Sequence, residues 1–298
     1  MRILMTGSSG FLGRAVLARL RAQDHEVIRL VRGDDAADDC VSWDPAAGEL
    51  KPAHVEGFDA VVHLAGESIV GERWSAAKMT RILESRITGT ELLVRTLSTA
   101  KTKPAVLVSA SALGFYGDRG DVELNELSGP GSGFLANVCR YWETSALEAK
   151  RHGIRVALAR FGIVIGPGGG ALKSMLGPFK LGVGGTIGSG DQYMSWIHID
   201  DAVKGVERMI SDDSLAGPVN LTGPAPVTNR EFVRALGAAL KRPTFLPMPS
   251  FAARVIFGRM ADNLLLASAR VIPTQLLERD FEFQHTTLES ALTAALNE

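Results

Sequence analysis

The chain opens on a short apolar run that leads directly into three closely spaced glycines. Residues 2–6 read Arg-Ile-Leu-Met-Thr, and glycines follow at positions 7, 10 and 13. A strand, a glycine-rich turn and a helix, in that order, form the place where a dinucleotide pyrophosphate binds. Gly7 permits the tight turn, Gly10 lets the backbone approach the phosphates, and Gly13 lets the helix pack on the strand. We therefore expect the unpaired amides at the helix start to face an anion.

Composition argues against several other classes of protein. The 298 residues are 46% apolar, with 32 basic and 33 acidic side chains, so nothing favours a nucleic acid or an anionic membrane as partner. No apolar run approaches the ~18 residues needed to cross a bilayer, and the opening run is too short for a secretion signal. We expect a cytoplasmic protein with a small-molecule substrate; monomer and homodimer both stay open.

The cysteine and histidine content predicts neither a disulfide nor a metal site. Cys40 and Cys139 are the only cysteines and lie far apart in the sequence, so we expect both to be free thiols. Histidine and cysteine spacings that are typical of metal sites do not occur.

Strand-like and helix-like segments alternate through the first two-thirds of the chain. Long amphipathic stretches cover residues 75–100 and 133–152. The runs rich in Val, Ile and Leu are residues 2–6, 26–31, 60–64, 105–109 and 155–165. This alternation predicts an α/β fold of the Rossmann type, with a doubly wound parallel sheet covered on both faces.

The character of the sequence changes from Pro167 onward. Residues 168–170 and 182–190 are dense in glycine, and five prolines follow between positions 224 and 249. We predict a dinucleotide-binding domain over residues 1–215 and a smaller, mainly helical C-terminal lobe over residues 216–298. Such a lobe would cover the sheet edge where ligands bind and would supply substrate contacts.

The end of the second strand indicates which dinucleotide binds. An acidic side chain about 20 positions past the glycines accepts a hydrogen bond from the ribose of NAD(H), whereas this chain has Arg32 there. A guanidinium can hold a 2′-phosphate through two parallel hydrogen bonds. We therefore predict NADP(H) rather than NAD(H). Two alternatives are that Asp34 or Asp35 takes the acidic position, and that Arg32 is an ordinary surface arginine.

Taken together, these motifs resemble the extended short-chain dehydrogenase/reductase superfamily, in particular its branch of NAD-dependent epimerase/dehydratase-like "epimerase family" proteins. The likeness spans nearly the whole chain, including the C-terminal lobe. The segments that carry it are 6–13, 63–67, 73–74, 85–86, 166–172, 188–192, 195–201, 220–222 and 260–266.

The resemblance implies a set of cofactor contacts. Leu64, Ala65 and Gly66 are expected over the adenosine half of the cofactor. Arg86 is expected to face the cofactor, with a plain surface charge as the alternative. The full predicted set is Gly7, Gly10, Phe11, Leu12, Gly13, Arg32, Leu64, Ala65, Gly66, Arg86, Gly162 and Val164, the last two in a strand beside the nicotinamide.

The usual catalytic pair of the superfamily is missing. Active members use a Tyr followed four residues later by a Lys, with a Ser or Thr upstream. The tyrosines are at positions 116, 141 and 193, and the residues four positions later are Gly, Ser and Ile. Where the resemblance would place the pair stand Phe134 and Val138, which cannot carry a proton.

Two hydroxyl groups are the remaining catalytic candidates. Ser111 could keep the role of the upstream hydroxyl or could be a turn residue. Tyr116 could replace the missing phenol or could anchor its loop as a half-buried aromatic. For Glu143 we expect a structural ion pair, and a role as a catalytic acid is the second alternative. Gln192, Trp196 and His198 are expected to face the substrate crevice, with no proton assigned to His198.

The sequence thus predicts an NADP(H)-dependent oxidoreductase or epimerase-like enzyme with an unusual proton-transfer set. The substrate would be a nucleotide sugar or a small carbonyl compound. The alternative is a catalytically silent NADP(H)-binding protein that senses the cofactor or docks a partner.

Overall fold

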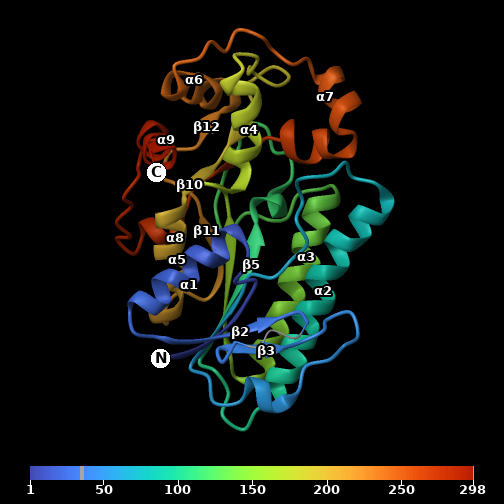
Figure 1. Cartoon of the computed structure of the whole chain (residues 1–298), viewed down its shortest axis with the longest axis vertical. Helices are drawn as coiled ribbons and strands as arrows, with labels where there is room; N and C mark the ends of the chain where they lie inside the picture. Colours follow the sequence, from blue (N-terminus) through green and yellow to red (C-terminus); the bar gives the residue numbers. More distant parts are fainter. Residues whose placement is uncertain (34–36, 298) are drawn as a thin grey trace.

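A seven-stranded parallel sheet forms the centre of the molecule (Figure 1). The structure, a computed structural model, describes residues 1–33 and 37–297. The strand order is β11-β7-β5-β4-β1-β2-β3, so the chain winds outward from β1 in both directions, and the predicted Rossmann-type fold is confirmed. The strands are β1 (Arg2–Thr6), β2 (Glu26–Val31), β3 (Cys40–Ser42), β4 (Ala60–His63), β5 (Val106–Ala112), β7 (Arg155–Phe161) and β11 (Gly217–Leu221).

Helices cover both faces of this sheet, and the alternation of side chains along β1 shows why. Ile3 and Met5 pack in one apolar core, whereas Leu4 between them packs in another, because successive side chains of a strand point to opposite faces. Both faces are therefore buried, as parallel sheets require. The helices are α1 (Phe11–Ala22) and α5 (Ile199–Ser211) on one face and α2 (Ala76–Thr99) and α3 (Phe134–Leu147) on the other (Figure 1).

A mainly helical lobe lies beyond the carboxyl ends of the strands, at the top of Figure 1. Its core joins Leu172, Trp196, Phe232 and Leu292. The helices of the lobe are α4 (Gly170–Lys180), α6 (Asn229–Leu240), α7 (Ser250–Phe257) and α9 (Leu288–Asn297). The small strand pairs are β8 (Ile163–Ile165) with β10 (Trp196–His198) and β9 (Tyr193–Met194) with β12 (Val227–Thr228).

Elements on both sides of the boundary predicted at residue 215 contribute to both parts. β11 lies after it in the sequence yet pairs with β7 in the main sheet. Conversely α4, β8 and β10 precede it yet contribute to the core of the lobe.

The remaining short elements are η1 (Pro52–Val55), η2 (Leu113–Tyr116), β6 (Glu123–Leu124), η3 (Glu148–His152), η4 (Ala261–Leu265), β13 (Arg270–Val271) and α8 (Thr274–Leu277).

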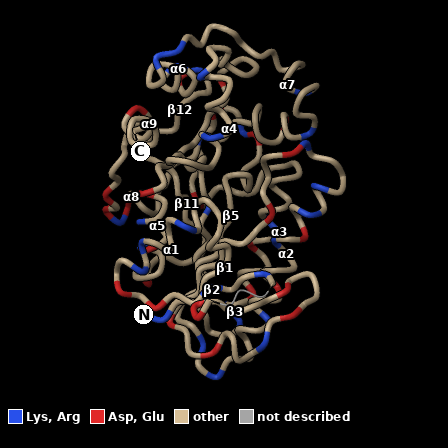
Figure 2. The backbone as a smooth tube through the Cα atoms, in the orientation of Figure 1, with Lys and Arg blue, Asp and Glu red and all other residues tan. Residues whose placement is uncertain are grey.

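Charged residues of both signs are interspersed along the backbone over the whole view (Figure 2). Within residues 1–33 and 37–297, no helix combines the length and the apolar character needed to cross a membrane. Cys40 and Cys139 are free thiols, as predicted.

A buried histidine ties together the elements beside the first turn. His63 is fully buried, and its Nδ1 lies 2.7 Å from Oγ1 of Thr6. Its Nε2 lies 2.9 Å from Oγ1 of Thr90 on α2. Burial lowers the pKa of His63 from 6.5 to about 4, because the charged imidazolium cannot be solvated there.

We predict that the free energy of unfolding falls by about 3 kcal/mol between pH ~7 and pH ~4 because of His63 alone. The unfolded chain takes up this proton near pH 6.5, before the folded chain does. The stabilisation that comes from keeping His63 neutral and buried is therefore complete above pH 6.5, and it is lost as the pH falls toward 4. Urea unfolding at several pH values should show a flatter profile for His63→Gln than for a control, His152→Gln, whose side chain is exposed. Equal profiles would contradict the assignment.

Candidate functional site

The turn between β1 and α1 leaves no room for side chains at two of its glycines. Gly7 has a positive φ of 71°, and a Cβ there would lie 2.6 Å from the carbonyl carbon of Leu64. A Cβ on Gly13 would lie 2.0 Å from the oxygen of Gly7. Among the described residues, α1 has neither a side-chain cap at Gly10 nor an acid in its first turn. Its first amides are therefore suited to bind an anion.

The end of β4 lies directly against this turn. Ala65 donates its amide to Oγ1 of Thr6 at 3.2 Å. A Cβ on Gly66 would lie 3.3 Å from the guanidinium carbon of Arg86, so Arg86 sits close to the backbone there. Gly66 itself is exposed and can be approached by a ligand.

Arg86 is a largely buried cation rather than a surface charge. Its Nη1 donates to the carbonyl oxygens of Glu67 and Ile82, both at 3.0 Å. The guanidinium lies 4.9 Å from the ring centroid of Trp142. Burial lowers the pKa of Arg86. The side chain is thus held in place at the carboxyl edge of the sheet.

Phe11 joins the glycine turn to the glycines that precede α4. A Cβ on Gly169 would lie 2.2 Å from the Phe11 ring, and one on Gly170 would lie 2.8 Å from it. The ring therefore occupies space that only glycines leave open. The backbone of Phe11 and Leu12 stays at the helix start, where the sequence predicted a cofactor contact.

Gly162 interrupts what the sequence presented as one long strand. A Cβ there would lie 2.7 Å from the oxygen of Ser195 and 3.1 Å from Cγ2 of Thr222. The close approach divides the run into β7 and β8, so the single strand predicted over residues 155–165 was wrong. Gly162 and Val164 are both partly exposed at this break.

Arg32 lies in an exposed bend directly after β2. Among the described residues, no side chain forms an ion pair with it. The alternative residues Asp34 and Asp35 lie outside the described residues.

A buried ion pair stands below the carboxyl ends of β5 and β7. Arg160 donates through Nε and Nη2 to the two carboxylate oxygens of Glu143, both at 2.8 Å. Ser111 donates to the same carboxylate at 2.6 Å. All three side chains are buried, and two parallel bonds between guanidinium and carboxylate are the strongest arrangement for such a pair. The structural ion pair expected for Glu143 is present.

Tyr116 extends this network and does not reach the surface. Its phenol is 0% exposed, accepts from Nη1 of Arg160 at 2.9 Å, and donates to Oδ1 of Asn220 at 2.7 Å. Burial raises the pKa of Tyr116. The backbone N–H of Asn220 in turn donates to Oε1 of Glu126 at 3.0 Å. A substrate could reach neither hydroxyl, Ser111 nor Tyr116, without displacing these partners.

The start of α3 presents an apolar wall. Phe134 is the first residue of α3, and its ring meets that of Trp74 edge-on at 5.5 Å. Val138, one turn further, is buried in the same cluster. The backbone amide of Phe134 donates to Oδ1 of Asn263 at 3.2 Å. The side-chain amide of Asn263 therefore lies beside this wall.

Three residues expected in the substrate crevice are buried instead. The side-chain amide of Gln192 donates to the carbonyls of Ile187 and Leu265, at 2.9 and 3.0 Å. Trp196 is 1% exposed and donates to the carbonyl of Ala225. His198 is 2% exposed. Gln192 and Trp196 thus hold loops of the lobe together from inside.

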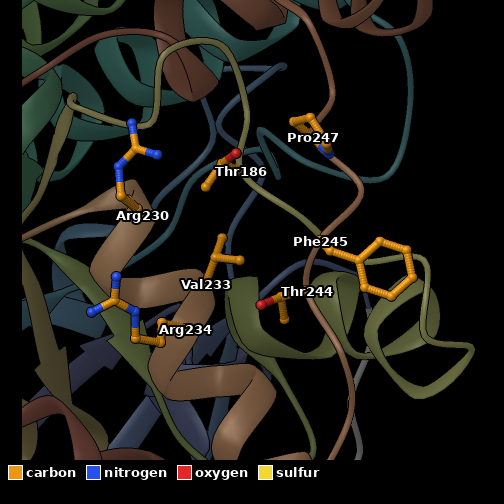
Figure 3. A pocket seen from close by; sticks show the side chains of 7 residues that line it. All are labelled: Thr186, Arg230, Val233, Arg234, Thr244, Phe245 and Pro247. Atoms are coloured by element: carbon orange, nitrogen blue, oxygen red, sulfur yellow. The ribbon is translucent and has the colours of Figure 1, made fainter.

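An open cavity of about 390 Å³ lies on the C-terminal lobe, away from the glycine turn (Figure 3). Arg230 and Arg234 both extend from α6, and Thr186 lies on the loop opposite Arg230 (Figure 3). Its other lining residues are Val233, Thr244, Phe245 and Pro247. None of the predicted cofactor residues lines this cavity.

The residues that sequence reasoning missed are polar side chains inside predicted apolar elements. Arg160 stands in the Val- and Ala-rich β7, and Asn220 in β11. Their partners come from helices and loops far away in the sequence, so no spacing signal pointed to them. A charged residue inside a run typical of a buried strand was the one available hint.

Comparison with known proteins agrees with this geometry. A model described as "NAD dependent epimerase/dehydratase family" matches residues 3–221. A second, described as "Domain of unknown function (DUF1731)", matches residues 248–295.

Two of the similar proteins match this chain along nearly their whole length, and a third is longer. Epimerase family protein Mb2239 of Mycobacterium bovis is 46% identical over 290 residues, covering 97% of this chain and 96% of the relative. A crystal structure of human epimerase family protein SDR39U1 with NADPH has a TM-score of 0.90 at 33% identity, and the match covers 100% of both chains. A nucleoside-diphosphate sugar epimerase from Corynebacterium glutamicum has a TM-score of 0.83 at 34% identity, covering 99% of this chain and 58% of that one.

We predict that Glu143→Ala lowers the free energy of unfolding by about 3–5 kcal/mol, because it leaves the buried Arg160 cation without its partner. Glu143→Gln keeps an acceptor for Ser111 and should cost less. The matched control is Glu148→Ala, which removes an exposed ion pair with Arg151 and should cost at most about 1 kcal/mol. Urea unfolding monitored by circular dichroism measures all three. Similar costs for Glu143→Ala and Glu148→Ala would contradict the buried pair.

Proposed function

We propose that this chain, which belongs to the NAD dependent epimerase/dehydratase family, is an oxidoreductase or epimerase-like enzyme that binds NADP(H). The observation that carries the proposal is the turn from Gly7 to Gly13. Its backbone is packed so closely that only glycines fit, and it presents the uncapped amides of α1. Such a turn binds the pyrophosphate of a dinucleotide.

The other cofactor residues follow the carboxyl edge of the sheet away from this turn. Leu64, Ala65 and Gly66 would lie against the adenosine half, where the exposed backbone of Gly66 allows close approach. Arg86 would fix the neighbouring backbone through its bond to Glu67. Gly162 and Val164 would lie beside the nicotinamide. The bound nicotinamide would supply hydride chemistry, and the protein would supply orientation.

Arg32 would select NADP(H) over NAD(H) by binding the 2′-phosphate. The exposed position directly after β2 supports this role. The NADPH in the human relative's crystal structure also supports it.

Ser111 and Tyr116 would act as positioning residues in such an enzyme. Both hydroxyls are bonded to the Glu143–Arg160 pair, so they would orient the floor of the site. Phe134 and Val138 would provide an apolar wall where relatives of the superfamily carry Tyr and Lys. The substrate would be a nucleotide sugar or a small carbonyl compound, and the name of the Corynebacterium relative favours the former.

A catalytically silent NADP(H)-binding protein is the second candidate. The absence of any Tyr-x-x-x-Lys pair in the sequence favours it, as does the apolar wall at Phe134. The cytoplasmic location and the division at residue 215 stay predictions under either function.

We predict that Arg32→Ala weakens NADPH binding by roughly tenfold or more, because a charge-assisted bond to the 2′-phosphate is worth ~1.5–3 kcal/mol. NADH binding should change by less than about twofold, since NADH lacks that phosphate. Calorimetric titration of both cofactors measures this. Arg151→Ala, an exposed arginine on η3, serves as the control and should bind both cofactors normally. Equal weakening of NADPH and NADH by Arg32→Ala would refute the selectivity proposal.

The enzyme is distinguished from the silent binder by turnover. Loss of NADPH absorbance should proceed steadily with at least one member of a panel of aldehydes, ketones and nucleotide sugars. On that substrate, Tyr116→Phe should lower kcat about tenfold without changing the Kd for NADPH, as expected for a positioning residue. Tight NADPH binding with no turnover on any panel member would favour the silent alternative instead.

A further inference from the structure

Two histidines and an aspartate that are distant in the sequence meet where the C-terminal segment crosses the start of α5. His198 ends β10, Asp200 lies in the first turn of α5, and His285 precedes α9. One ring nitrogen of each histidine and one carboxylate oxygen of Asp200 lie within 4.8 Å of one another. The Nδ1 atom of His198 is 3.4 Å from Oδ2 of Asp200, and the imidazole centroids are 4.1 Å apart.

A separate buried carboxylate fixes the backbone that carries His285. Asp201 is 0% exposed and accepts hydrogen bonds from the amides of Gln284 and His285, at 2.7 and 3.0 Å. It therefore holds the C-terminal segment against α5 independently of the three side chains in the cluster.

The ring of His285 is oriented by a second contact. Its Nδ1 lies 2.9 Å from Oγ of Ser290, so Nε2 is the nitrogen that can serve another ligand. Histidines that bind metals typically have their second ring nitrogen held by a polar group in this way.

We propose that His198, Asp200 and His285 form a binding site for a divalent transition metal of the Zn²⁺ class. Two imidazole nitrogens and one carboxylate oxygen suit Zn²⁺, Co²⁺ and Ni²⁺. Mg²⁺ and Ca²⁺ prefer oxygen ligands, so the two nitrogens discriminate against them. A water molecule completes a tetrahedral coordination shell.

Only a small movement closes the cluster around an ion. Ligand atoms about 2.1 Å from a tetrahedral Zn²⁺ are about 3.4 Å apart, so a separation of 4.8 Å must shrink by about 1.4 Å. The side chain of Asp200 is 54% exposed, and His285 is half-buried. Both can rotate toward His198, whose ring is fixed in the interior.

The ion would join two parts of the chain. α5 packs on the main sheet, whereas the segment after His285 leads into α9, whose Leu288 and Leu292 belong to the core of the lobe. Binding would stabilise this attachment by mass action. The sequence predicted no metal site because the ligands meet only after folding. The cluster shares no residue with the proposed cofactor site.

The test uses the full chain, stripped by a chelator, with CoCl₂ and ZnCl₂ as probes. We expect one equivalent of Co²⁺ to bind with the visible absorption of tetrahedral cobalt, and Zn²⁺ to displace it. His285→Gln and Asp200→Asn should each weaken Co²⁺ binding by about tenfold or more. His152→Gln changes an exposed histidine on η3 and should bind Co²⁺ like the unaltered chain.

Thermal unfolding provides a second readout on the same samples. Zn²⁺ should raise the Tm of the unaltered chain and of His152→Gln, and should leave that of His285→Gln unchanged. Circular dichroism without metal checks that each variant is folded, which is expected because the substituted side chains are partly exposed. Failure of the unaltered chain to bind one equivalent of either ion would overturn the proposal, as would equal Co²⁺ affinities in His285→Gln and His152→Gln. NADPH affinity, measured separately, tests the cofactor proposal and has no bearing on this outcome.

Discussion

The contact between Gly13 and the carbonyl oxygen of Gly7 is the constraint on which the rest of the site depends. Any Cβ at Gly13 would collide with that oxygen, so α1 can begin at this angle only when the position is glycine. β1 lies between β2 and β4 in the sheet, and Gly7 touches the end of β4 at Leu64. The turn therefore fixes where α1 starts relative to the middle of the sheet. The positions of the other proposed cofactor residues relative to the pyrophosphate depend on where α1 starts.

The ion pair between Glu143 and Arg160 lies in the interior of the protein and is not exposed at the site. Removing Glu143 and Arg160 from water is costly, and the cost is offset only when the geometry is good and the remaining hydrogen-bonding atoms have partners. Ser111 and Tyr116 provide those partners, and the guanidinium carbon of Arg160 also lies 3.5 Å from the ring centroid of Phe115. These contacts orient the side chains of Glu143 and Arg160. The wall that Phe134 and Val138 form at the start of α3, by contrast, is apolar. Chemistry at this edge of the sheet would therefore depend on the bound cofactor and substrate more than on an exposed acid.

Local patterns predicted the fold well where an element buries a continuous apolar run. β1 and β2 have the predicted limits, and Ser75 caps α2 where the amphipathic stretch begins. β11 was missed because Gly217-Pro218-Val219-Asn220 resembles a turn, and it becomes a strand only by pairing with β7. The resemblance to the epimerase family was confirmed. At the start of α6, Thr228 and Glu231 form a capping box.

Side-chain environments were harder to predict than elements. At the start of α9, for example, the helix begins at Leu288, and Oγ1 of Thr287 accepts from the backbone amide of Ser290. The burial of Tyr116 depends on Asn220, which lies 104 residues away in the chain. Contacts of this kind arise from tertiary packing, and a single sequence carries no periodic signal for them.

The interleaving of the lobe with the sheet bears on how the protein is made. Trp196 leaves the ribosome before Phe232, and both precede Leu292, yet the three share one core. β7 likewise waits for β11 to cover its outer edge. During synthesis the nascent chain therefore exposes an unpaired strand and an incomplete apolar core until β11 and α9 have been released. The chain is vulnerable to aggregation until that point, and its lobe is not a module that can be cut away or transplanted intact.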